Sequence, residues 1–117
     1  MVDQIIITDP TTSDRGNLSQ FWQEQAEWSR ATFGDDNERG PTGPLKHLRK
    51  EVDEVLKDPT DLVEYADLLF LVFDSTRRAG FTYDQLVEAC FSKLKINKER
   101  KWSKPTSDEP VEHVRDE

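Results

Sequence analysis

Cysteine, long hydrophobic runs and positive charge are all scarce in this sequence. The one cysteine, Cys90, excludes a disulfide framework and a cysteine-based zinc site. No apolar run approaches the ~18 residues of a membrane span. The apolar start, residues 5–7, follows Asp3 and lacks a basic segment, so we expect no signal peptide. A cytoplasmic protein without membrane contact is the default expectation.

The shortage of positive charge limits which binding partners are expected. Lys and Arg number 16 against 24 Asp and Glu, which gives a net charge of −8. Such an acidic chain is not expected to coat DNA or RNA. A small anionic ligand stays compatible with it, because a site can be locally basic or can hold metal ions.

Four segments carry a helical spacing of apolar residues, and breakers separate them. They are residues 18–33, 45–57, about 59–79 and about 82–100. Asn17 is a plausible cap of the first, and Thr82 with Gln85 forms a capping box for the fourth. Gly34 and Gly80 end the first and third. We therefore predict helices joined by short connections.

The fold class that these segments predict is all-α. At 117 residues the chain has the size of one compact domain, 1–117. We expect a four-helix bundle over residues 18–102. Residues 1–16 are expected to form an extended arm, and residues 103–117 an extended or partly disordered tail.

The third predicted helix has almost no polar face. Its apolar residues are Leu62, Val63, Tyr65, Ala66, Leu68, Leu69, Phe70, Leu71, Val72 and Phe73. A helix that is apolar all round is buried on all sides, which a four-helix monomer of this size can hardly achieve. We therefore expect a subunit interface to cover its outer side.

Glu64 and Asp67 interrupt this apolar helix, three residues apart and hence on one side of it. We expect Asp67 to be buried, and it has no cation three or four residues away to pair with. The simpler interpretation is that Glu64 caps the helix while Asp74 pairs with Arg78.

The second helix carries a matching pair, Glu51 and Glu54, with His47 one turn earlier. Its basic residues lie on the opposite flank, so its charges are segregated rather than paired. A short turn makes these two helices antiparallel and allows both acidic pairs to face each other. Four converging carboxylates repel unless cations lie between them, and hard oxygen ligands select Mg²⁺ or Mn²⁺. The acidic loop 35–40 lacks the ligand spacing of a calcium-binding hand.

A basic stripe near the end of the fourth helix complements the acidic quartet. Lys93, Asn97 and Arg100 stand at positions i, i+4 and i+7, and we expect them to point toward the bundle. Cations there also complement the helix dipole, which is an equally good account of Lys95, Lys98 and Lys101. Divalent ions on carboxylates beside Lys, Asn and Arg describe a polyphosphate site.

The acidic residues match a family signature. Glu51 and Glu54, followed by Glu64 and Asp67, match the E-x-x-E…E-x-x-D pattern of the all-α, MazG-like nucleoside triphosphate pyrophosphohydrolases. Residues 93–102 and 110–115 resemble its dATP/dGTP pyrophosphohydrolase branch, found in phages and bacteria. The resemblance covers roughly residues 18–115.

This resemblance implies hydrolysis of a purine nucleoside triphosphate, dGTP, GTP or dATP, to the monophosphate and pyrophosphate. The four acidic residues would hold two or three Mg²⁺ or Mn²⁺ ions, and Glu51 or Glu54 would accept the proton of the attacking water. The resemblance places Lys93, Asn97 and Arg100 on phosphates or sugar, and implies a homo-oligomer, commonly a tetramer of two dimers. Trp22, Trp28 and Phe33 are candidates for stacking on the base, although a tryptophan on a helix is more often core.

Two alternatives stay open. A dUTP- or dCTP-type pyrophosphatase of the same superfamily would carry the same acidic residues and differ only in its base pocket. A non-enzymatic helical adaptor would use the acidic stripe to bind a partner, although a buried Asp67 would argue against it.

Overall fold

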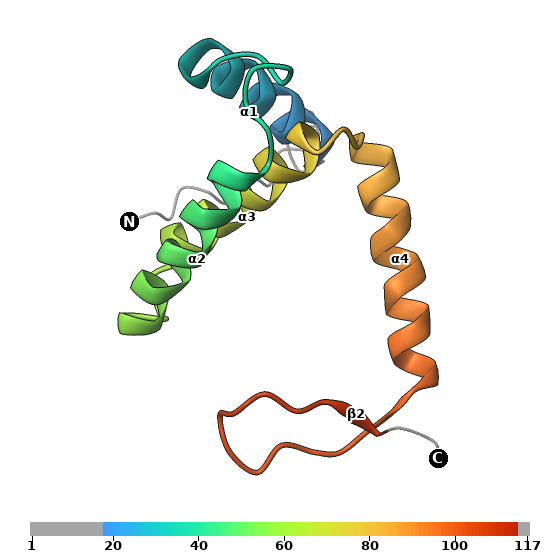
Figure 1. Ribbon diagram of the computed structural model, residues 1–117. Coiled ribbons are helices and arrows are strands. Elements are labelled where there is room, and N and C mark those ends of the chain that lie inside the picture. Colours follow the sequence, from blue (N-terminus) through green and yellow to red (C-terminus); the bar gives the residue numbers. More distant parts are fainter. Residues whose placement is uncertain (1–17, 115–117) are drawn as a thin grey trace, which may run out of the picture. The chain divides into compact units, whose positions relative to one another are not determined.

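The computed structural model describes residues 18–114 and contains four helices. They are α1 (Leu18–Phe33), α2 (Thr42–Lys57), α3 (Leu62–Arg78) and α4 (Tyr83–Glu99). Two short strands follow, β1 (Lys101–Trp102) and β2 (His113–Val114) (Figure 1). The predicted all-α fold class is confirmed. The expected arm 1–16 and the cap Asn17 lie outside the described residues.

The helix boundaries follow from local residues, and two predictions about helix starts were wrong. Gly34 and Gly80 adopt φ values of 108° and 100°, and they end α1 and α3 as expected. α2 begins at Thr42 rather than Leu45, because Pro41 already has helical φ and ψ and accepts a hydrogen bond from the Leu45 amide. The cap of α3 is Asp61, whose carboxylate accepts from the Val63 amide at 3.1 Å, and not Glu64.

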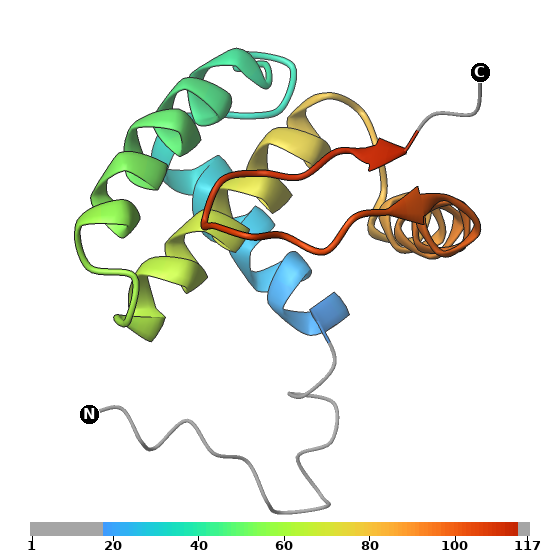
Figure 2. The same cartoon turned by 90° about the horizontal axis from the view of Figure 1, so that it is seen from below.

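The described residues divide into two compact units, 18–83 and 84–114, and the expected single domain stays a prediction. In the first unit, α2 and α3 run antiparallel side by side, and α1 packs on α3 (Figures 1 and 2). The turn between α2 and α3 is only four residues long. Residues at similar distances from this turn therefore lie opposite each other on the two helices. The buried apolar side chains of this unit are Trp22, Ala26, Val55, Leu71 and Phe73.

Within the single chain, α3 is buried unevenly along its length. Its apolar first half is exposed in the chain, with Leu62 at 65% and Val63 at 56%. Asp67, which we expected to be buried, is exposed too. The charged second half is buried instead, because Asp74 and Arg78 satisfy each other's hydrogen bonds there.

The second unit consists of α4 and a hairpin. β1 pairs antiparallel with β2, Lys101 opposite Val114 and Trp102 opposite His113. The Trp102 indole donates to the carbonyl oxygen of Asn97 at 2.8 Å. Of the expected extended or partly disordered tail, residues 103–112 form the connection between the strands, and residues 113–114 form the second strand. No helix within residues 18–114 is long and apolar enough to cross a membrane.

Candidate active site

Three carboxylates from two helices meet on one side of the α2–α3 pair. α2 supplies Glu51, and α3 supplies Glu64 and Asp67. One oxygen atom of each lies within 4.8 Å of the other two. His47 stands one turn before Glu51, with its Nε2 atom 3.6 Å from the Glu51 Oε2 atom. The convergence predicted from the sequence is thus present for three of the four acidic residues.

The electrostatics of Glu64 reflect this crowding. Desolvation raises the pKa of Glu64 above its ordinary value, and the charges of Asp67, Asp61, Glu51 and Glu54 raise it further. Neighbouring negative charges disfavour ionisation, and a cation placed among these oxygens would relieve that repulsion. Carboxylate oxygens are the donors that Mg²⁺ and Mn²⁺ prefer, so these residues fit such an ion.

Glu54 is the member of the predicted quartet that lies outside this group. Its carboxylate pairs with Lys57, with 3.4 Å between Oε2 and Nζ. This corrects the expectation that the charges of α2 are segregated rather than paired. The pair is exposed and therefore weak, and Glu54 is near enough to Glu64 for its charge to raise the Glu64 pKa.

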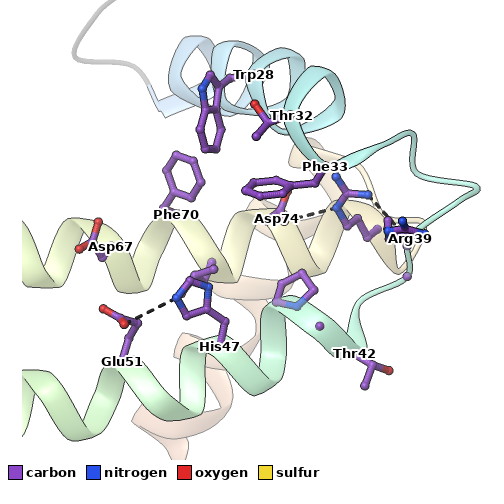
Figure 3. A pocket seen from close by; sticks show the side chains of 15 residues that line it. Trp28, Thr32, Phe33, Arg39, Thr42, His47, Glu51, Asp67, Phe70 and Asp74 are labelled. Carbon is purple, nitrogen blue, oxygen red and sulfur yellow. Dashed lines mark hydrogen bonds and ion pairs between the residues drawn. The ribbon is translucent and has the colours of Figure 1, made fainter.

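A cavity of about 930 Å³ lies beside the carboxylates, bounded by α1, α2, α3 and the loop 34–41 (Figure 3). Glu51 and Asp67 line it at one end, and Arg39 lies toward the other. Small-molecule sites have volumes of roughly 300–1,000 Å³. The cavity is therefore large enough for a ligand that reaches from the carboxylates to the loop.

Aromatic rings form the wall between the two ends of the cavity. The Trp28 ring lies 5.4 Å from the rings of Phe33 and Phe70, in edge-to-face geometry with both. Trp28 is 51% exposed, which leaves ring surface for a ligand. Trp22, in contrast, is 8% exposed and packs on Phe73, so this stacking candidate belongs to the core.

A buried charge cluster lies toward the loop end of the cavity. One oxygen of Asp74 accepts from Gln25, Ser29 and Arg77 at 3.1, 2.7 and 2.7 Å. The other accepts from Arg78 at 3.3 Å, which confirms the predicted Asp74–Arg78 pair. Burial alone would raise the pKa of Asp74. The hydrogen bonds from Ser29, Gln25 and Arg77, with the Arg77 charge, lower it below the ordinary value instead.

The comparisons with known proteins assign the chain to a family. The model of the dATP/dGTP pyrophosphohydrolase family matches residues 21–117, which include every cavity residue. The chain belongs to the dATP/dGTP pyrophosphohydrolase family. The resemblance seen in the sequence is thereby confirmed.

A solved structure agrees with this membership. It is the cyanophage S-2L MazG-like pyrophosphohydrolase, bound to dGDP and three catalytic Mn²⁺ ions per active site. The match has a TM-score of 0.68 and 25% identity, and covers 86% of this chain and 96% of that one. It confirms the MazG-like fold.

A curated relative comes from a phage as well. The Eaa protein of Salmonella phage P22 is 46% identical over 95 residues, which are 81% of this chain and 29% of Eaa. The chain thus spans less than a third of the length of that relative.

The basic stripe of this family member lies in the second unit. Lys93 is exposed on α4, and Arg100 stands just beyond the end of that helix, so the stripe is shorter than predicted. Asn97 is half-buried, and its Oδ1 atom has no hydrogen-bond partner within residues 18–114. Their contact with a nucleotide remains a prediction.

Phe70 and Arg39 are among the cavity residues for which the sequence predicted no functional role. Phe70 stands three residues after Asp67 on α3, and this spacing was the signal that places it on the carboxylate side. Arg39 lies in an irregular loop, where no periodicity reports the direction of a side chain.

Proposed function

We propose that this protein hydrolyses a purine deoxynucleoside triphosphate, dGTP or dATP, to the monophosphate and pyrophosphate, with Mg²⁺ or Mn²⁺. One observation carries the proposal: three carboxylates converge at one end of a cavity with an aromatic wall. Membership of the dATP/dGTP pyrophosphohydrolase family and the Mn²⁺ and dGDP bound by the cyanophage protein support it.

Glu51, Glu64 and Asp67 would hold the metal ions. They come from two adjacent helices, so their main-chain positions are set before any ion binds. Glu54 would join them by giving up its exposed pair with Lys57, which costs little because solvent already screens it. Two or three ions per site, as proposed from the sequence, would use these four carboxylates.

When bound, the divalent ions would neutralise phosphate charge and lower the pKa of the attacking water. The chain's own residues would supply the remaining steps. Glu51 or Glu54 would accept the proton of that water. As the family resemblance implies, Lys93, Asn97 and Arg100 would bind phosphates or sugar, the phosphates through charge-assisted hydrogen bonds.

The aromatic wall would bind the base. Trp28 and Phe33 are about half exposed, at 51% and 54%, and both line the cavity. A purine offers two fused rings for stacking, and stacking on an aromatic side chain contributes roughly 1–3 kcal/mol. The wall would therefore hold the base while the carboxylate end holds the phosphates.

The alternatives have weaker support. A dUTP- or dCTP-type enzyme would need the same carboxylates, but the family match and the bound dGDP of the cyanophage relative favour a purine. The argument from a buried Asp67 against an adaptor no longer holds, because Asp67 is exposed. The convergence of three carboxylates beside a ligand-sized cavity replaces that argument.

A homo-oligomer, a tetramer of two dimers, is part of the proposal. Exposed apolar side chains on α2 and α3 support it: Val52, Leu56, Leu62, Val63, Tyr65 and Leu69. A patch of this kind marks an interaction surface. The cytoplasm, which holds the nucleotide pool, is the proposed compartment.

A substrate screen tests the proposal. The common NTPs and dNTPs are incubated with the protein and Mn²⁺, pyrophosphate release is measured, and the nucleotide product is identified by chromatography. Purine monophosphate plus pyrophosphate is the expected result, with no turnover by Asp67→Asn. Release of orthophosphate, or equal turnover by Asp67→Asn, would reject the assignment.

A further inference from the structure

The loop between α1 and α2 has a defined conformation. The Asp35 amide donates to the Glu38 carboxylate at 2.8 Å, closing a local turn after Gly34. The Asp36 carboxylate accepts from Arg30 at 3.1 Å and from Arg77 at 3.2 Å. The loop is thus attached to α1 and to α3.

Arg78 of α3 completes this attachment from inside. Its side chain is 1% exposed, and it donates to the main-chain oxygens of Gly34 at 3.1 Å and Arg39 at 3.3 Å. The main chain of the loop at Gly34 and Arg39 is therefore anchored to α3. Arg39 and Gly40 are the loop residues that line the cavity.

Few polar groups at this end of the cavity are available to a ligand. Both oxygens of Asp74 already accept hydrogen bonds, and Arg78 is buried among its acceptors. The hydroxyls of Thr32 and Thr42 can donate or accept, so they do not select a base by themselves.

Arg39 is different. Its side chain is exposed, and the one hydrogen bond that this side chain donates within residues 18–114 runs from Nη1 to the Glu38 main-chain oxygen at 3.2 Å. Within the described part of the chain it forms no ion pair, unlike Arg30, Arg77 and Arg78. Arginine has five N–H donors and no acceptor, so most of the donors of Arg39 have no partner among residues 18–114.

The order of groups along the cavity places Arg39 beyond the aromatic wall. Figure 3 shows Glu51 and Asp67 at one end, Arg39 toward the other, and Phe70 and Phe33 between them. If the phosphates bind at the carboxylates, as in the proposed function, a base on the wall turns an edge toward the loop.

We propose that Arg39 is a specificity-determining residue that reads the O6 and N7 atoms of guanine and favours dGTP over dATP. Guanine presents two adjacent acceptors there, which match the parallel donors of a guanidinium. Adenine presents an amino donor in place of O6 and would leave one Arg39 donor facing another donor. This inference rests on the proposed function, because that function sets the orientation of the nucleotide in the cavity, with its phosphates at the carboxylates.

Kinetics of Arg39→Ala test the inference against a matched control. Arg49→Ala removes an exposed arginine of α2 that does not line the cavity. The kcat/KM for dGTP and for dATP is measured with Mn²⁺. We expect the wild type to prefer dGTP, and Arg39→Ala to lower its value for dGTP by about 5- to 100-fold. The value for dATP should change little, and Arg49→Ala should match the wild type for both.

Binding of dGDP and dADP with Mn²⁺, measured by calorimetry, provides a readout that does not need turnover. We expect Arg39→Ala to weaken dGDP binding selectively. An unchanged dGTP-to-dATP ratio, a wild type that prefers adenine, or equal losses for both bases would overturn the inference; equal losses would indicate a phosphate contact. If no nucleotide is hydrolysed, the proposed function fails, and the binding ratio still decides whether Arg39 reads guanine.

Discussion

Replacing Arg78 by Met should destabilise the protein more than any change to its exposed charges. The substitution keeps the aliphatic length and removes the guanidinium from a site where the side chain is 1% exposed and its Asp74 partner 8%. Breaking a buried ion pair costs about 3–5 kcal/mol because the remaining charge stays buried. Asp74 keeps Arg77, Ser29 and Gln25 as donors, so we expect the lower end, about 3 kcal/mol.

Urea unfolding and thermal melting measure this loss. For a domain of this size we expect Tm to fall by about 10–20 °C. A double-mutant cycle with Asp74→Asn should give a coupling energy of about 1–3 kcal/mol, because the two side chains are in contact. Lys57→Met, which breaks an exposed pair, should cost under about 1 kcal/mol. An Arg78→Met protein as stable as Lys57→Met, or an additive double mutant, would refute this reasoning.

Three further outcomes are expected. Trp28→Ala should raise KM about tenfold with little change in kcat, since base stacking contributes roughly 1–3 kcal/mol. Phe81→Ala is the control, because Phe81 is exposed but lies outside the cavity. An equal KM for Trp28→Ala and wild type would contradict the stacking role. The lowered pKa of Asp74 stabilises the fold above the ordinary carboxyl pKa of about 4, and this contribution is lost as pH falls through the lower folded value. Urea titrations at several pH values below about 5 should show that the free energy of unfolding falls more steeply with pH for the wild type than for Asp74→Asn. Parallel curves would argue against this role of Asp74. Light scattering at micromolar concentration should show at least a dimer. Leu62→Lys places a charge in the exposed apolar patch of α2 and α3 and should shift the equilibrium toward monomer. A monomeric wild type would show that the patch needs no partner subunit.

The sequence was most informative where periodicity governs the structure. Apolar spacing and glycine breakers located all four helices, and the spacing of Glu51, Glu64 and Asp67 predicted their convergence, because backbone geometry alone places them. Glu54 differs because the local direction of its side chain, toward Lys57, is not a matter of spacing.

Burial and loop structure were the parts that the sequence did not reveal. The charged end of α3 is buried because Ser29 and Gln25, distant in sequence, satisfy Asp74. The single chain leaves the apolar half of α3 exposed. The proposed subunit interface would cover it. The two-residue strands are too short to show alternation, and Arg39 depends on a loop held by Arg78 from a different helix.

The position of water attack is the most direct test of the central claim. Hydrolysis of dGTP with Mn²⁺ in water labelled with heavy oxygen is followed by mass spectrometry of both products. The account predicts the label in dGMP and unlabelled pyrophosphate, since the carboxylate end of the cavity is proposed to bind the α-phosphate together with the attacking water. Label in pyrophosphate or in released orthophosphate, or turnover that persists without a divalent metal, would contradict it.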